Sequence, residues 1–110
     1  MLYFLRVVLK QPASMSAKEF YECWARETRS ALQSKKAGRI KALYKVSGRR
    51  EILGILDLPT NRDVDKVLEG LPITQEIGHS VEFEVTPIYL YEELAEDLEE
   101  RVKQARNPSS

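Results

Sequence analysis

An α+β domain built on a four-stranded antiparallel sheet is the fold class that the sequence predicts, and three observations predict it. Strand and helix patterns follow one another in the order β-α-β-β-α-β over the 110 residues. Residues 39–58 hold two apolar runs separated by a short turn, which is typical of a β-hairpin. Residues 52–56 are apolar on both faces, so we expect helices on one side of the sheet and a second copy of the chain on the other.

The first predicted strand, residues 2–10, is apolar on both faces except for Arg6 and the terminal lysine, so we expect it to be central. Two interpretations of Arg6 are open. Its aliphatic stem can lie along apolar surface while the guanidinium stays in water. Alternatively, the guanidinium points into a ligand pocket, where Arg6 would bind substrate, or across a subunit interface.

The first predicted helix begins at a capping box formed by Ser16 and Glu19 and continues to about residue 35, where Gly38 ends it. Helical spacing predicts an inward face made of Phe20, Cys23, Trp24, Glu27, Ala31 and Ser34.

Glu27 is the anomaly on this face, because it lies along the same side of the helix as the aromatic residues. Partial burial would raise the pKa of its carboxyl group and suit it to carry a proton near neutral pH. The alternative is a structural salt bridge to Arg6, Lys45 or another cation.

In the hairpin, alternation predicts that the strand at residues 39–46 buries Ile40, Ala42, Tyr44 and Val46. Gly48 supplies the positive φ of the turn at residues 47–50. Tyr44 should therefore face the first helix and meet Glu27 in the cleft between helix and sheet.

The second half of the chain repeats the pattern. Thr60 and Asp63 begin a helix that ends at Gly70, residues 72–78 read as a loop over the end of the sheet, and residues 79–87 alternate as a fourth strand. His79 lies where loop and strand meet. The simplest interpretation of this lone histidine is a surface or structural role, and the alternative is a catalytic role at the mouth of the cleft.

Residues 90–106 predict a third amphipathic helix, whose apolar stripe should dock on the protein's own body or on a neighbouring subunit. Residues 107–110 are expected to be frayed. We therefore divide the chain into a ferredoxin-like, split-βαβ domain at residues 1–89 and a C-terminal helix with its tail at residues 90–110.

Composition narrows the classes of function. Seventeen basic and seventeen acidic residues cancel, which argues against a nucleic-acid partner. No apolar run is long enough for a membrane span, and no signal peptide is recognisable. One cysteine, Cys23, allows neither an internal disulfide nor a cysteine cluster for a metal, so we expect a cytoplasmic protein. No P-loop, dinucleotide fingerprint or nucleophile elbow is present.

The residues that remain form a candidate site rather than a motif. We expect Glu27 as the proton carrier and Tyr44 as a hydrogen-bond donor, with His79 or Arg49 at the mouth. Aromatic walls would come from Phe20 and Trp24, although such residues more often belong to a core. A carboxylate beside a phenol suits the removal of a proton next to a carbonyl group and its return elsewhere.

Short motifs in a characteristic order then point to a known family. They are MLYFLRVVLKQPASM at the start, Glu27 within ARET, LYKVSG ending at Gly48, Asp57-Leu-Pro, Leu71-Pro72 and EVTP at 84–87. With them the chain resembles muconolactone δ-isomerase over about residues 1–87. The resemblance implies a dimeric ferredoxin-like α/β-barrel that can assemble further. It also implies an enzyme of aromatic catabolism that shifts a proton in an unsaturated lactone, with Glu27 in its site and no metal or organic cofactor.

The chain departs from the family pattern at Ala42, Arg49, Arg50 and Ile52, where the family carries histidine, histidine, tyrosine and asparagine. A related proton transfer or cyclisation of another small carbonyl compound is therefore an equally open interpretation. Two further alternatives are a cofactor-free monooxygenase acting on aromatic polyketides and a non-catalytic protein that binds a ligand and oligomerises.

Overall fold

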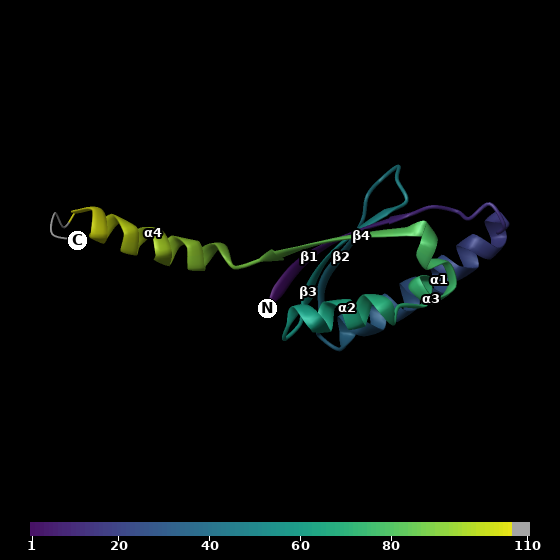
Figure 1. Cartoon of the computed structure of the whole chain (residues 1–110), viewed down its shortest axis with the longest axis horizontal. Coiled ribbons are helices and arrows are strands. Elements are labelled where there is room, and N and C mark those ends of the chain that lie inside the picture. The colour runs from purple at the N-terminus through teal and green to yellow at the C-terminus, as the bar shows by residue number, and fades with distance from the viewer. Residues whose placement is uncertain (107–110) are drawn as a thin grey trace.

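The computed structural model describes residues 1–106 and has the predicted α+β architecture. Its elements are β1 (Leu2–Leu9), α1 (Ala17–Lys36), β2 (Ile40–Lys45), β3 (Glu51–Asp57), α2 (Asn61–Glu69), α3 (Pro72–Ile77), a 3₁₀ turn η1 (Gly78–Ser80), β4 (Val81–Ile88) and α4 (Tyr91–Arg106). The four strands form an antiparallel sheet in the order β2-β3-β1-β4, and α1, α2 and α3 cover one of its faces (Figure 1). We call the covered face the inner face and the opposite face the outer face. The expected frayed end at residues 107–110 lies outside the described residues.

The core lies between the inner face and the helices. Alternate residues of the central strand β1 are buried there, namely Tyr3, Leu5, Val7 and Leu9. Phe20 and Cys23 of α1 are fully buried against them, as the helical spacing predicted. The capping box of Ser16 and Glu19 is confirmed, because each residue's side chain accepts a hydrogen bond from the other's backbone N–H.

The predicted alternation of β2 is wrong after its first residue. Ile40 pairs with Leu56 but Ala42 pairs with Ile55, so β2 contains one extra residue at Lys41, a β-bulge. The bulge exchanges the two faces, because strand side chains alternate with a period of two. Tyr44 therefore pairs with Leu53 on the outer face and is 67% exposed, instead of being buried under α1.

The predicted loop at residues 72–78 is also wrong, because it forms the short helix α3 and the start of η1. Pro72 occupies the first helical position, where its missing N–H costs nothing. Ile73 and Ile77, four residues apart, are both buried. A short apolar pair at helical spacing behind a proline was thus the signal for this helix.

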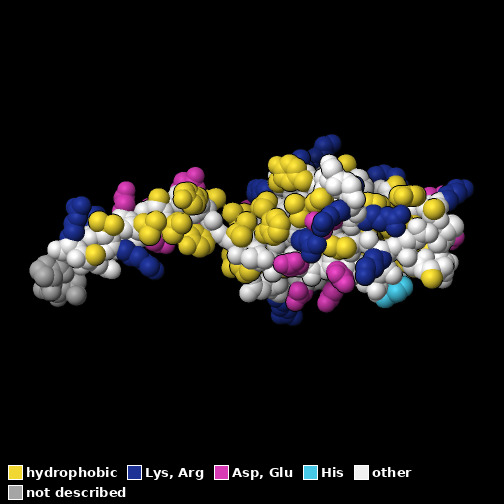
Figure 2. All heavy atoms as spheres, turned by 90° about the horizontal axis from the view of Figure 1, so that it is seen from above, with side chains coloured by type: hydrophobic (Ala, Val, Ile, Leu, Met, Phe, Trp, Pro, Cys, Tyr) yellow, Lys and Arg dark blue, Asp and Glu magenta, His cyan; other side chains and the backbone are white. Residues whose placement is uncertain are grey.

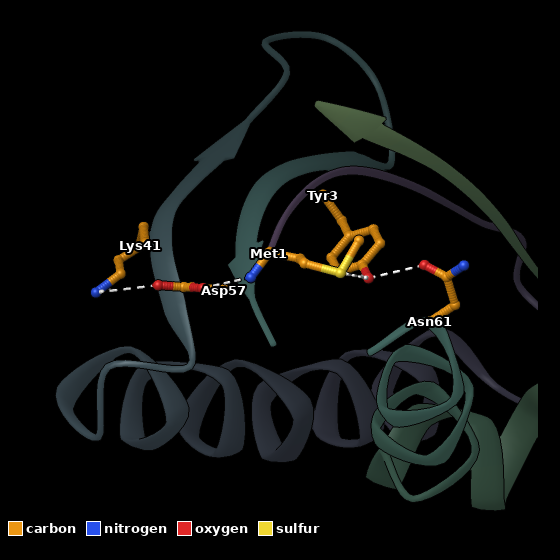
Figure 3. A network of polar contacts seen from close by, with 5 residues as sticks. All are labelled: Met1, Tyr3, Lys41, Asp57 and Asn61. Carbon is orange, nitrogen blue, oxygen red and sulfur yellow. Dashed lines mark hydrogen bonds and ion pairs between the residues drawn. The ribbon is translucent and has the colours of Figure 1, made fainter. Parts of the chain in front are cut away.

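A polar network ties the end of the sheet to the start of α2 (Figure 3). The hydroxyl of Tyr3 donates a hydrogen bond to Asn61 Oδ1 at 2.8 Å. The amino group of Met1 and the ammonium of Lys41 both lie within ion-pair distance of Asp57, at 3.3 and 3.8 Å. The bulged residue of β2 is therefore also anchored to β3 by its side chain.

The outer face carries half-buried apolar side chains around a group of charges, as Figure 2 shows from the side of the sheet away from the helices. These apolar residues are Phe4, Val8, Leu53 and Ile55. Among them, Arg6 Nη2 lies 2.7 Å from Glu51 Oε1, and Arg6 Nη1 lies 3.4 Å from Glu84 Oε2. Together the two carboxylates raise the pKa of the Arg6 guanidinium, and the hydrogen bond that Arg6 donates to Glu51 contributes most.

The predicted C-terminal helix is present, and it projects from the end of β4 away from the body (Figure 1). It extends the molecule to 68 Å along its longest axis. Within residues 1–106, no helix is both long enough and apolar enough to cross a bilayer.

The turn between α1 and β2 gives a test of the fold. Gly38 has a φ of +87° and no atom within 4 Å of the position that a Cβ would occupy. Gly38→Ala should therefore lower the free energy of unfolding by about 1–2 kcal/mol through backbone strain alone. Urea denaturation followed by circular dichroism measures this change.

Gly78 provides the matched control, because its φ is −51° and an added Cβ would make only an ordinary contact with Thr74. Gly78→Ala should change the free energy of unfolding by no more than about 0.5 kcal/mol. Equal losses in the two variants would show that the strain assigned to Gly38 is absent.

Candidate functional site

A cavity of about 300 Å³ lies between α1, the α2–α3 segment and the inner face of the sheet. Its floor comprises side chains of β1 and β3, including Leu5, Val7 and Ile52. Trp24 and Ala31 of α1 contribute to its roof. Its lining is almost entirely apolar, and its size suits a small organic molecule.

Glu27 is the one acid among the described residues that line this cavity. The position agrees with the prediction that it lies in a cleft between helix and sheet. Desolvation raises the pKa of its carboxyl group, and a hydrogen bond from the backbone N–H of Ile73 to Oε2, at 3.2 Å, opposes that rise only in part. Among residues 1–106, Glu27 makes no ion pair, so the structure has no salt bridge to Arg6 or Lys45.

Helix α3 presents the donor for Glu27. The N–H of Ile73 lies in the first turn of α3, where backbone donors have no partner within the helix. α3 is tied to α1 by a two-pronged ion pair, in which Arg26 Nη2 lies 2.6 Å from Glu76 Oε2 and Nε lies 2.9 Å from Oε1. This pairing also lowers the pKa of Glu76. The carboxylate of Glu27 is thus held by the backbone of a segment that the sequence had suggested to be a loop.

Lys45 is the one base among the described lining residues, and the prediction of site residues missed it. The bulge at Lys41 places Lys45 opposite Ile52 on the inner face. Among the described residues, Lys45 and Glu27 form no ion pair. The sequence gives no sign of the bulge, and without the bulge strand alternation would place Lys45 on the outer face.

Two of the predicted site residues border the cavity besides Glu27. Trp24 lines it from α1, as expected for an aromatic wall. Tyr44 borders it from the edge strand β2, but its side chain belongs to the outer face and is largely exposed. The exposed residues Thr28, Leu32, Tyr44 and Lys45 therefore mark its mouth along the β2 edge.

The other predicted site residues lie elsewhere. Arg6 is on the outer face, with the sheet between it and the cavity. Arg49 is exposed in the hairpin turn, and His79 is exposed in η1. Phe20 is a core residue with no exposed surface, and neither it nor the other three lines the cavity.

The aromatic residues of α1 have a cationic neighbour that the sequence analysis assigned no role. The guanidinium carbon of Arg50 lies 5.0 Å from the ring centroid of Phe20, and Arg50 Nη2 donates a hydrogen bond to the hydroxyl of Tyr21 at 3.4 Å. On the same helix Cys23 is fully buried, and burial raises the pKa of its thiol to about 11, so the thiol stays protonated.

The geometry so far defines a class of protein: a small α+β domain with an apolar, ligand-sized cavity that contains a single desolvated acid. Residues 1–93 match the sequence profile of the family described as muconolactone delta-isomerase, and the chain belongs to this family. No curated protein matches the sequence significantly.

A solved structure shares the fold. The crystal structure of muconolactone isomerase at 3.3 Å resolution superposes with a TM-score of 0.70 at 20% sequence identity, over 83% of this chain and 91% of that chain. At this identity the likeness establishes the fold. Family and fold together support an isomerase-like function for the chain.

The structure shows where the residues that depart from the family pattern lie. Ile52 lines the cavity, so the asparagine that the resemblance implies there is replaced by an apolar side chain. Ala42 lies on the outer face, and Arg49 is in the hairpin turn. The change at residue 52 makes the lining of the cavity more apolar.

The raised pKa of Glu27 predicts a pH dependence of stability. Between the ordinary glutamate pKa and the raised folded value, the folded chain holds a proton that the unfolded chain has released. Unfolding therefore releases a proton in this window, and the free energy of unfolding falls as the pH rises through it. Chemical denaturation at a series of pH values should show this loss in the native chain.

Glu27→Gln is the matched variant, because the amide oxygen can still accept the hydrogen bond from Ile73. The free energy of unfolding of this variant should not fall in that window, and near neutral pH the variant should be at least as stable as the native chain. A native chain that instead gains stability relative to Glu27→Gln as the pH rises would mean that the carboxylate is stabilised, not desolvated.

Proposed function

We propose that the protein is a cofactor-independent isomerase that moves a proton within a small unsaturated lactone or a related carbonyl compound, with Glu27 as the proton carrier. The observation that carries this proposal is the position of Glu27: it is a half-buried acid in an apolar cavity and forms no ion pair among the described residues. Membership of the muconolactone delta-isomerase family supports the same reaction class.

The proposed reaction takes two proton transfers. The carboxylate of Glu27 removes a proton from a carbon activated by the lactone carbonyl, which leaves an enolate conjugated with the carbon–carbon double bond. The carboxylic acid so formed returns the proton to another carbon of the conjugated system, and the double bond moves. The raised pKa makes Glu27 a stronger base when ionised and leaves it able to give the proton back.

Two donors at the mouth of the cavity are available for the negative charge of the substrate. Lys45, which carries an ammonium group, and Tyr44, which carries a hydroxyl group, both border the cavity. We assign the enolate oxygen or another anionic substituent to Lys45, since its side chain is on the inner face, and we retain Tyr44 as a donor that must turn inward from the rim. No metal or organic cofactor takes part in the proposed reaction.

The apolar cavity is also compatible with one alternative function. Trp24 and Phe83, both of which line it, would accept a flat ring, as a cofactor-free monooxygenase or cyclase of aromatic polyketides would require. A Glu27 paired with an arginine and without a cavity beside it would have favoured the non-catalytic alternative. Among the described residues Glu27 forms no ion pair, and it lines a cavity.

Glu27→Gln tests the reaction. With muconolactone as the probe in D₂O, proton NMR should show both the movement of the double bond and the incorporation of deuterium by the native protein. The variant should lose about 10²- to 10⁴-fold in rate, because its amide cannot accept the proton.

Glu22→Gln, an exposed change on the same helix, is the matched control and should keep the native rate. Full turnover by folded Glu27→Gln would remove this mechanism. Oxygen consumption by the native protein with a polycyclic phenol, together with no exchange of muconolactone protons, would favour the monooxygenase instead.

We also propose a homodimer in which the outer faces of two sheets pack together, with higher assembly possible. The half-buried apolar side chains of the outer face support this arrangement, because such a patch is characteristic of a contact surface. The charges of Arg6, Glu51 and Glu84 would then be satisfied within each subunit. A reducing cytosol is the proposed compartment, since it keeps the free thiol of Cys23 reduced.

Leu53→Glu tests the dimer, because it places a charge in the middle of the proposed contact. Sedimentation velocity should show a dimer or larger assembly for the native chain and a folded monomer for Leu53→Glu. Lys66→Glu, an exposed change on the far side of the molecule, should sediment like the native chain. A native chain that sediments as a monomer at micromolar concentration would contradict the arrangement.

A further inference from the structure

Helix α4 carries an apolar stripe that nothing in the described chain covers. Its residues are Tyr91, Leu94, Leu98, Val102 and Ala105, which a rotation of 100° per residue places within about 40° of one line along the helix. Tyr91 is 80% exposed, and Leu98 and Val102 are half exposed. A helix of 16 residues gains most of its stability by packing an apolar face, so α4 needs an occupant for this stripe.

The charges of α4 identify which occupant fits. Residues 92–100 contain six acids and no base, namely Glu92, Glu93, Glu96, Asp97, Glu99 and Glu100. The last turns contain three bases and no acid, namely Arg101, Lys103 and Arg106. A parallel copy of α4 would place acids against acids over most of its length. An antiparallel copy would place the acidic half against the basic end.

We propose that α4 docks against α4 of a second copy of the chain as an antiparallel pair, with Leu98 at the two-fold axis. This inference is independent of the reaction proposed for the cavity. It concerns a segment that lies mostly beyond the family match, which ends at residue 93.

One register pairs the apolar residues of the stripe with one another and also brings opposite charges together at its borders. With Leu98 facing the partner's Leu98, Leu94 lies opposite the partner's Val102 and Tyr91 lies opposite the partner's Ala105. The stripe is therefore self-complementary, as a two-fold contact requires. At its borders, Asp97 comes within reach of the partner's Arg101, and Glu92 comes within reach of the partner's Arg106. Among residues 1–106 none of these four charges forms an ion pair within the chain.

The pair would be small. Each helix is roughly 24 Å long, at 1.5 Å per residue, and two such helices bury less surface than a stable interface usually does. The contact therefore forms only weakly between free copies and is strengthened where other contacts already hold two copies together. Covalent trapping in the full chain is the appropriate measurement, because it records a contact that is populated only part of the time.

Single cysteines in α4 test the pair and its direction. Under mild oxidation, Leu98→Cys should form a disulfide-linked dimer on a non-reducing gel. Leu94→Cys and Val102→Cys should each stay monomeric alone and form a dimer when mixed. Glu100→Cys, on the opposite side of the helix, is the matched control and should stay monomeric. Cys23 is buried and common to all four variants.

The outcomes are decisive in both directions. A Leu94→Cys dimer formed without Val102→Cys would show a parallel pair and overturn the proposal. If Leu98→Cys forms no more disulfide-linked dimer than Glu100→Cys, the stripe packs on another surface, for instance the body of another subunit. That result would also overturn the proposal. In the Leu98→Cys background, Arg101→Asp should slow dimer formation about twofold to fivefold. Adding Asp97→Arg should restore the rate, and failure of that rescue would contradict the register.

Discussion

The contact of Phe20 and Cys23 with the inner face of the sheet holds α1 in place, and the cavity follows from it. Both side chains are fully buried, whereas Glu27 and Ala31, further along the same helix, are only half-buried and line open space. A helix is stiff over this distance, so docking at its first half leaves the second half at a fixed height above the strands. The apolar floor beneath it then becomes the wall of a cavity rather than a filled core.

The same contact determines the electrostatics of Glu27. Its carboxyl group lies over apolar strand residues, and Arg26, its neighbour on α1, is already paired with Glu76. Among the described residues, the one hydrogen-bond partner of the Glu27 carboxyl group is the backbone N–H of Ile73 in α3. A single neutral donor compensates little of the cost of removing an ionised carboxylate from water, so the neutral form is favoured. The structure thus contains a carboxyl group with a raised pKa, which is the property that the proposed proton transfers require.

The sequence predicted the parts of this arrangement that depend on local chemistry. The capping residues Ser16 and Thr60 fixed the starts of two helices, and helical spacing placed Glu27 over the sheet. The bulge at Lys41 could not be predicted, because an inserted residue leaves no mark on the apolar alternation of a short strand. Tyr44 and Lys45 were therefore assigned to the wrong faces. Arg6 was placed in the pocket as one option because both faces of β1 are apolar, and only the packing of α1 decides which face holds the cavity.

The measurement that tests the account most directly is a carbon-13 NMR titration of the Glu27 side-chain carboxyl group in the intact protein. The account predicts a midpoint clearly above the ordinary glutamate value of about 4.3, and a further change in that midpoint when a small unsaturated lactone fills the cavity. A midpoint at or below the ordinary value, unaffected by such a ligand, would show that the carboxylate is well solvated or paired. In that case the cavity would contain no proton carrier.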